Sequence, residues 1–211
     1  MRLDRIVLAS GNAGKLAELG ALLTPLGVTV HAQAALGVTE AEEPHPTFIE
    51  NALAKARRAS RLTGLPAIAD DSGLCVDALG GRPGVLSARW ASAGSHDGGD
   101  RDRSERDRAN NAKLVRELAG CADRRAHFYC VLVLLRAADD PQPIIGDASW
   151  AGEVIDVPRG TGGFGYDPHL WIPALGCTVA ELDPETKNRL SHRGRAMRAL
   201  IERLREAGAF A

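Results

Sequence analysis

A chain of 211 residues, 45% of them hydrophobic, can bury a core as one or two domains without disulfides or structural metals. Its 26 Lys and Arg residues nearly balance 27 Asp and Glu residues, which argues against a broad nucleic-acid-binding surface. The N-terminus has no apolar signal core, and no stretch is long enough to cross a bilayer. We therefore expect a cytoplasmic protein that binds neither nucleic acid nor membrane.

The four cysteines stand far apart in the sequence, at Cys75, Cys121, Cys130 and Cys177. They form no CxxC pair, and no histidine lies beside them at zinc-ligand spacing. Cys75 and Cys130 sit in apolar runs, where a buried thiol is the usual finding. We expect free thiols rather than a structural disulfide.

The beginning of the chain alternates between strand and helix patterns. The apolar run at residues 6–9 predicts a short buried strand, and a turn-forming run follows at 10–14. Leucines then recur at helical spacing as far as Leu23, and residues 28–31 predict a second strand. The acidic, proline-broken segment 37–46 is typical of a loop.

A longer helix comes next. Thr47, with Glu50 three residues on, forms a capping box at its start. Residues 65–69 predict a strand that ends at the acidic pair following it. The later elements are expected to be a charged loop over 94–108, a helix through Leu114 and Leu118, a strand over 128–135 covered on both faces, strands within 144–155 broken near Gly152, a glycine-rich loop over 160–167, and an amphipathic helix through Met197, Ile201 and Leu204.

This alternation predicts an α/β protein built on a central mixed sheet flanked by helices. The sequence contains no internal repeat, low-complexity tract or linker. We therefore expect a single domain spanning residues 1–211.

The segment 10–15 (SGNAGK) lies between a predicted strand and a predicted helix. Backbone N–H groups at a helix N-terminus, with a lysine beside them, can bind phosphate. The spacing is not that of a Walker A loop, since Leu16 stands where the magnesium-binding hydroxyl would be. An ordinary turn with a solvated lysine is the alternative.

The Asp70-Asp71 pair ends an apolar strand in this prediction, so one carboxylate can face a cleft while the other anchors the loop. Acidic residues also occur upstream at Glu42 and Glu43. Oxygen ligands of this kind suit Mg²⁺ bound together with substrate phosphates. A carboxylate can also orient or deprotonate an attacking water. The alternative is that these acidic side chains are simply solvated. This alternative is weaker for Asp70 and Asp71 than for Glu42 and Glu43.

The glycine pattern GxGxxG, which is typical of dinucleotide sites, occurs at Gly160, Gly162 and Gly165. Pro168 follows directly, so no helix can begin there, and a dinucleotide site is excluded. We expect these glycines to let the backbone approach a ligand, with the Phe164 and Tyr166 rings facing a base. A hairpin loop with two core aromatics is the alternative.

Two further segments carry charge. Ser191-His192-Arg193-Gly194 (residues 191–194) precedes the last helix, where positive charge opposes the helix dipole and donors could meet a base or a phosphate. The run from Arg101 to Arg108 alternates in sign, which indicates a solvated loop or helix face. Trp90, Trp150 and Trp171 have no ligand-like context, and we interpret them as core or interface residues.

The chain contains six motifs whose residues and order resemble those of the inosine triphosphate pyrophosphatase family. They lie at residues 10–15, 47–52, 69–74, 83–89, 160–168 and 191–194. The bacterial dITP/XTP pyrophosphatases are the most similar branch. The resemblance runs from Ile6 nearly to the C-terminus. It departs at the Pro44-His45-Pro46 turn, which leaves the choice between Glu42 and Glu43 open, and at the longer, more charged segment 94–108.

The resemblance implies a homodimer whose subunits have an elongated, curved mixed sheet, with a nucleotide cleft between two lobes. It implies Mg²⁺-dependent hydrolysis of ITP, dITP or XTP to a nucleoside monophosphate and pyrophosphate. Asp71 would be the catalytic base and a metal ligand, with Glu42 or Glu43 beside it. The implied substrate-binding residues are Ser10, Gly11, Asn12, Ala13, Gly14, Lys15, Ser72, Phe164, Gly165, Tyr166, Asp167, Lys187, His192 and Arg193.

Donors near His192 and Arg193 could bond to the 6-keto oxygen of a purine and reject adenine, because adenine presents a donor there and its binding would leave the buried donors of the site unpaired. Three alternatives have different chemistry. They are a pyrophosphatase for modified pyrimidine or methylated nucleotides, a nucleotide-binding regulator without turnover, and a nucleic-acid-binding module.

Overall fold

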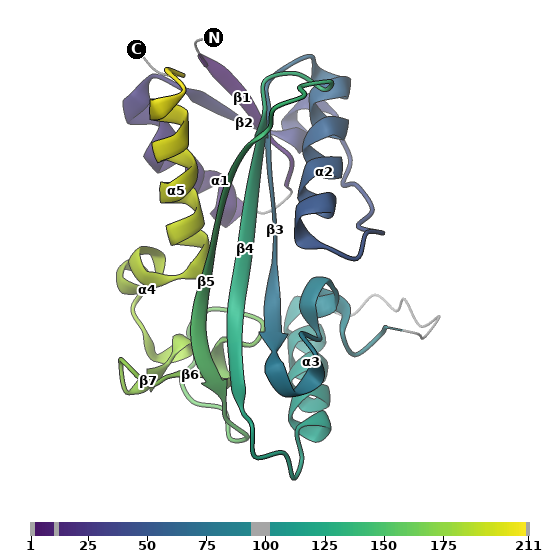
Figure 1. Ribbon diagram of the computed structural model, residues 1–211, viewed down its shortest axis with the longest axis vertical. Coiled ribbons are helices and arrows are strands. Elements are labelled where there is room, and N and C mark those ends of the chain that lie inside the picture. The colour runs from purple at the N-terminus through teal and green to yellow at the C-terminus, as the bar shows by residue number, and fades with distance from the viewer. Residues whose placement is uncertain (1–2, 11–12, 94–101, 210–211) are drawn as a thin grey trace. The chain divides into compact units, whose positions relative to one another are not determined.

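The computed structural model describes residues 3–10, 13–93 and 102–209 (Figure 1). Its helices are α1 (Ala13–Leu23), α2 (Phe48–Thr63), α3 (Arg103–Glu117), α4 (Pro184–Leu190) and α5 (His192–Glu206). Its strands are β1 (Arg5–Leu8), β2 (Thr29–Ala32), β3 (Ala67–Val76), β4 (Arg125–Leu135), β5 (Ile144–Val154), β6 (Leu170–Ile172) and β7 (Cys177–Thr178). Short 3-10 turns include Gly84–Arg89 and Val179–Glu181.

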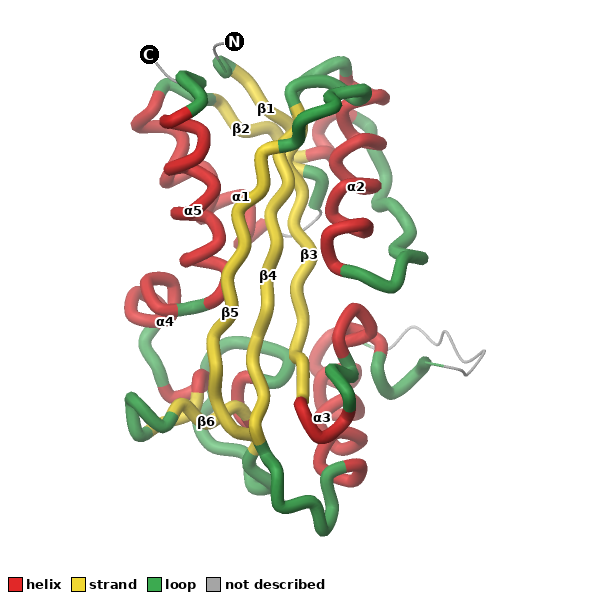
Figure 2. The backbone as a smooth tube through the Cα atoms, in the orientation of Figure 1, coloured by secondary structure: helices red, strands yellow, loops and turns green. Residues whose placement is uncertain are grey.

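The strands form a sheet in the order β2-β1-β3-β4-β5-β6-β7. β1 runs parallel to both β2 and β3, whereas β6 runs antiparallel to both β5 and β7. The long strands β3, β4 and β5 lie side by side in this order, with β4 in the middle (Figure 2). The prediction of an α/β protein with a mixed sheet and flanking helices is confirmed.

The chain divides into two compact units. Unit 1 comprises Met1–Asp71, Cys130–Ala148 and Arg195–Ala211, and unit 2 comprises Ser72–Tyr129 and Ser149–Gly194. The boundaries fall inside β3, β4, β5 and α5. The expectation of a single domain stays a prediction, and we return to it below.

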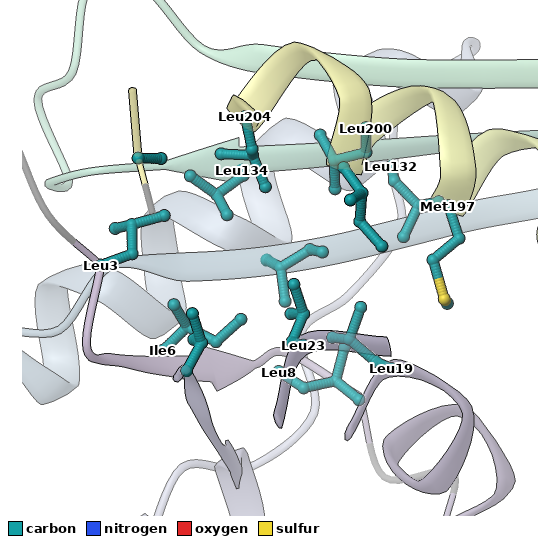
Figure 3. Packing of buried hydrophobic residues seen from close by; sticks show 14 of the residues in the cluster. Leu3, Ile6, Leu8, Leu19, Leu23, Leu132, Leu134, Met197, Leu200 and Leu204 are labelled. Atoms are coloured by element: carbon teal, nitrogen blue, oxygen red, sulfur yellow. The ribbon is translucent and has the colours of Figure 1, made fainter. Parts of the chain in front are cut away.

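The core of unit 1 forms where α5 and α1 pack on the strands (Figure 3). Residues 130–135 of β4 are all buried, as expected for a strand covered on both faces. The amphipathic pattern of the last helix is also confirmed, since its apolar residues face this core. The main contributors are Ile6, Leu8, Leu19, Leu23, Leu132, Leu134, Met197, Leu200 and Leu204.

The core of unit 2 joins α3 to residues of β3, β4 and β5. Leu114 and Leu118 are fully buried, as their helical spacing predicts. They belong to one cluster with Leu74 of β3 and Trp150 and Val154 of β5. α3 is therefore a fixed element of unit 2, held by apolar packing along its inner face.

The expected break near Gly152 is wrong, because β5 runs without interruption from Ile144 to Val154. A Cβ at Gly152 would lie 2.4 Å from the carbonyl oxygen of Trp171 in β6. The glycine therefore allows the neighbouring backbone to approach, which is a common reason for glycine inside a strand.

The remaining sequence expectations can be checked at single residues. All four cysteines are free thiols, with Cys130 buried and Cys75 half-buried. Trp90 and Trp150 are buried, as expected for core residues. Thr47 caps α2 by accepting a hydrogen bond from the Glu50 N–H. In the described part of the chain, none of the helices has the length and apolar character needed to span a membrane.

Candidate functional site

Asp70 and Asp71 lie inside β3 rather than at its end, which corrects the sequence-based boundary. Both are buried, with 3% and 7% of their surfaces exposed. Successive strand residues point to opposite faces of a sheet, and here the two carboxylates meet different helices. Because each has a charged or polar partner, the acidic pair can occupy the strand interior.

Asp70 faces α1. The Lys15 ammonium lies 2.8 Å from both of its carboxylate oxygens. Lys15 is the lysine of the expected phosphate segment, and the helix it belongs to starts at Ala13. Ser10 is half-buried just after β1, and Gly14 is exposed. Gly11 and Asn12 of this segment lie outside the described residues.

Asp71 faces α2. The Asn51 amide nitrogen donates to its Oδ2 at 3.2 Å, and the Lys55 ammonium lies 3.8 Å from its Oδ1. Lys55 also donates to Glu43 Oε1 at 2.6 Å. Burial by itself would lower the pKa of Lys55, but the charges of Asp71 and Glu43 outweigh burial and raise that pKa above its usual value. We call Lys15, Glu43, Asn51, Lys55, Asp70 and Asp71 the carboxylate–lysine cluster.

Asn51 links this cluster to the turn at residues 44–46. Its side chain is fully buried, accepting from the His45 N–H at 3.0 Å and donating to the His45 carbonyl at 3.1 Å. The turn that departs from the family pattern is thus held by α2. It leaves Glu42 exposed and brings Glu43 to Lys55, so Glu43 is the glutamate of the cluster.

Unit 2 contains a second set of candidate residues around the aromatic loop, which we define as residues 160–167. Phe164 is 43% exposed. Three cations lie over it, with Arg103, Lys187 and Arg193 at 4.3, 4.7 and 5.8 Å from the ring centroid. An exposed aromatic face surrounded by positive charge can stack on a base and attract its phosphates.

Asp167 fixes this loop from within. Its Oδ2 accepts from the Phe164 N–H at 2.8 Å and from the Lys187 ammonium at 2.5 Å. Burial raises the pKa of Asp167 above its usual value, and the neighbouring Lys187 opposes that rise. Asp167 therefore bonds both to Phe164 of the loop and to Lys187 of α4, and it holds the ammonium close to the ring.

The Tyr166 ring does not offer a face to a base, and that expectation is wrong. Tyr166 is 4% exposed, belongs to the core of unit 2 and donates through its hydroxyl to the Ser87 carbonyl at 2.9 Å. Burial raises the pKa of Tyr166 well above its usual value. Phe164 fits the ligand interpretation, whereas Tyr166 fits the core alternative.

Two of the loop glycines also serve the fold rather than a ligand. Cβ atoms at Gly160 and Gly162 would lie 2.6 and 2.9 Å from the Ala180 carbonyl oxygen. The Gly162 N–H donates to that same oxygen at 3.0 Å. The close approach predicted for these glycines is therefore an approach to the protein's own backbone.

His192 and Arg193 form the first turn of α5, so the last helix begins within the 191–194 motif rather than after it. The His192 ring stacks on Phe128 of β4, with 4.9 Å between the centroids and 23° between the planes. Arg193 reaches toward Phe164. Both side chains are half-buried, as is Ser72 in β3.

Sequence reasoning missed several of these residues. Asn51 lies in the motif at residues 47–52, but the sequence did not indicate its bonds to Asp71 and His45. Lys55 gave no signal beyond its place one helical turn further along α2. The charged run from Arg101 to Arg108 was interpreted as a solvated loop or helix face. From Arg103 onward it is helical and mostly exposed, but the sequence did not indicate that Arg103 and Asp107 contact the aromatic loop. Residues 94–101 of the predicted loop lie outside the described residues.

Together these features define an α/β protein with buried, lysine-paired carboxylates in one unit and a cationic aromatic loop in the other. The Ham1 family model matches residues 6–203. A dITP/XTP pyrophosphatase of Ralstonia nicotianae is 66% identical over 95% of this chain and 96% of its own length. One of Burkholderia pseudomallei is 60% identical over 96% of this chain and 94% of its own.

Solved structures agree with the sequence matches. A HAM1 protein from Coxiella burnetii has a TM-score of 0.88 and 44% identity, covering 98% of this chain and all of its own. A nucleoside-triphosphatase (dITP/XTP pyrophosphatase) from Mycobacterium abscessus has a TM-score of 0.72 and 40% identity, covering 93% of this chain and 98% of its own. The chain belongs to the Ham1 family.

Proposed function

We propose that this protein is a nucleoside triphosphate pyrophosphatase that hydrolyses non-standard purine nucleotides such as ITP, dITP and XTP. Relatives named dITP/XTP pyrophosphatase match nearly the whole chain at about 60% identity or more. The observation that supports the chemistry best is Asp71, a buried carboxylate held by Asn51 and Lys55 beside Glu43. The products are a nucleoside monophosphate and pyrophosphate, which removes the altered base from the nucleotide pool.

In the proposed reaction Asp71 accepts a proton from water as the water oxygen bonds to the α-phosphorus. The bond from that phosphorus to the oxygen bridging to the β-phosphorus breaks, and pyrophosphate leaves. Lys15 and the segment at residues 10–15 bind the phosphates through ammonium and backbone N–H groups. Lys55 stabilises negative charge at Asp71 and at the phosphates, since a lysine acts as a compact point charge.

We propose Mg²⁺ as the cofactor, held by Glu43 and Asp71. Among the described residues, no group of three or more His, Cys, Asp or Glu side chains forms a metal site by itself. Mg²⁺ is usually bound by one or two carboxylates together with substrate phosphates, so two carboxylates are sufficient. When bound, the ion would neutralise phosphate charge and assist the leaving pyrophosphate.

We assign recognition of the purine base to residues of unit 2. Phe164 would stack on the purine, and His192 and Arg193 would donate hydrogen bonds to its 6-keto oxygen. Lys187, Ser72 and Asp167 would complete the contacts with the substrate. A homodimer in the cytoplasm is the assembly and location that we propose with this function.

The test is pyrophosphate release from ITP, XTP, dITP, GTP and ATP with Mg²⁺, using the wild type and Asp71→Asn. We expect fast turnover of the first three nucleotides and slow turnover of GTP and ATP. General-base catalysis contributes about 10²–10⁴-fold, so Asp71→Asn should lower kcat by at least about 100-fold.

Asp139→Asn makes the same chemical change at an exposed position of unit 1 and should leave kcat unchanged. Equal turnover of all five nucleotides would remove base selection from the proposal. Binding without turnover would indicate a nucleotide-binding regulator instead.

A further inference from the structure

Helix α3 contacts the aromatic loop through residues spaced four apart. Arg103, Asp107 and Asn111 occupy one face of the helix, since residues at i and i+4 are neighbours on its surface. We call these three residues the α3 stripe. All three, together with the loop they meet, belong to unit 2.

Two members of the stripe hold a single glycine. The Asp107 carboxylate accepts from the Gly165 N–H at 2.8 Å, and the Asn111 amide nitrogen donates to the Gly165 carbonyl at 2.9 Å. Both polar backbone atoms of Gly165 are therefore fixed by α3. Gly165 has φ of +61°, in the left-handed region that favours glycine, so the chain turns sharply beside Phe164.

The third member reaches the ring itself. The Arg103 guanidinium lies 4.3 Å from the Phe164 centroid. On the inner side of the loop, Asp167 accepts from the Phe164 N–H. Phe164 is thus located by a bond to its own backbone, by two bonds to the next residue and by a cation over its ring.

α3 is itself well anchored, which makes it a suitable support. Asn110, next to the stripe, donates to the carbonyls of Ser87 and Ala88 and accepts from the Ala91 N–H. Leu114 is fully buried one turn further on. A loop held by a rigid element keeps its side chains in a narrow range of positions, and recognition of a flat base depends on this.

We propose that Asp107 and Asn111 are positioning residues for base selection, which place Phe164 against the purine without touching it. This inference rests on the proposed function, and it adds a helix face outside the six sequence motifs. The expected consequence is specific, because loosening the loop should impair contacts with the base and leave contacts with the phosphates intact.

The experiment compares Asp107→Leu and Asn111→Leu with the wild type. Each removes one bond to Gly165, and we expect KM for ITP to rise about tenfold and the ratio of kcat/KM for ITP over ATP to fall by a similar factor. Inhibition by inorganic tripolyphosphate, which has no base, should change by less than about twofold. Deuterium exchange of peptides covering residues 158–167 should become faster.

Two conservative variants separate positioning from a general loss of structure. Asp107→Asn keeps an oxygen that can accept from the Gly165 N–H and should restore most of the selectivity. Asn111→Asp places an acceptor against the Gly165 carbonyl and should be at least as damaging as Asn111→Leu. Glu105→Gln is the control: it also replaces a carboxylate of α3 by an amide, but at an exposed position that does not contact the loop. It should leave KM and the ITP/ATP selectivity unchanged.

The outcomes are distinct. Unchanged ITP/ATP selectivity in both leucine variants, or an Asp107→Asn variant as damaged as Asp107→Leu, overturns the inference. So does an equal loss in ITP turnover, ATP turnover and tripolyphosphate inhibition, because that pattern indicates a purely structural role. A wild-type enzyme without turnover overturns the proposed function and this inference together, whereas turnover with unaltered selectivity in the variants overturns the inference alone.

Discussion

At the scale of single residues, Asn51 shows how one buried amide can organise a site. It donates to the Asp71 carboxylate while its two polar atoms also bind the N–H and carbonyl of His45. The same side chain therefore orients the proposed base and fixes the turn after Glu43. Because all of this depends on an amide that both donates and accepts, neither Asp nor Leu can replace it.

Asn51→Asp should move the acid limb of the pH profile of kcat for ITP to higher pH. A carboxylate beside Asp71 disfavours the ionised form and raises the pKa of Asp71, so a higher pH is needed to deprotonate the base. The measurement is kcat against pH for the variant and for Gln142→Glu, which adds the same charge at the exposed β4–β5 turn. An active Asn51→Asp enzyme with an unshifted acid limb would show that Asn51 does not act on the base.

At the scale of secondary-structure elements, the β4–β5 turn is closed by a buried carboxylate. Asp140 accepts from the Arg136 backbone N–H at 2.9 Å, from the Arg136 side chain at 2.7 and 2.6 Å, and from the Gln142 N–H at 3.0 Å. The hydrogen bonds from the Arg136 side chain hold the pKa of Asp140 well below its usual value. The turn therefore depends on an ionised aspartate.

Because the pKa of Asp140 is lowered on folding, its stabilising contribution is present above the unfolded pKa of about 3.8 and disappears as the pH falls below it. Asp140→Asn should reduce the free energy of unfolding by about 1–2 kcal/mol at pH 7. The difference from the wild type should shrink as the pH is lowered from about 4 toward 2. Urea unfolding at several pH values measures this, and the exposed neighbour Asp139→Asn should show no difference at pH 7.

At the scale of the whole molecule, both units contain parts of β3, β4, β5 and α5. Their cores are nevertheless built from different residues, with Leu200 in unit 1 and Leu114 in unit 2. Trp90, Trp150 and Trp171 all lie in unit 2, so tryptophan fluorescence reports on that unit alone. Far-ultraviolet circular dichroism reports on the whole chain.

If residues 1–211 form a single domain, Leu200→Ala should shift both signals equally. Deleting a fully buried leucine typically costs about 3–5 kcal/mol, so the unfolding midpoint should fall in fluorescence as well as in circular dichroism. Leu114→Ala provides the matched change in unit 2. A Leu200→Ala variant whose fluorescence midpoint stays at the wild-type value would show that the two units unfold independently.

The sequence by itself determined the elements and the family. Local periodicity and capping are encoded by neighbouring residues, so the helix after Thr47, the buried strand over 128–135 and the last helix could be predicted. The motifs were enough to select Asp71, Lys15 and Phe164 as candidate site residues. The break near Gly152 was predicted wrongly, since a glycine that admits a neighbouring strand looks the same in sequence as one that ends a strand.

Only the tertiary structure decided which partners these residues meet. Lys55 reaches Asp71 and Glu43 from another element, and Asp107 and Asn111 reach a glycine more than fifty positions away. The inward turn of Tyr166 and the contact of Glu43 with Lys55 also depend on packing between distant segments. Side-chain contacts between elements are fixed by the fold as a whole, so residues outside a local motif leave no local signal of their role.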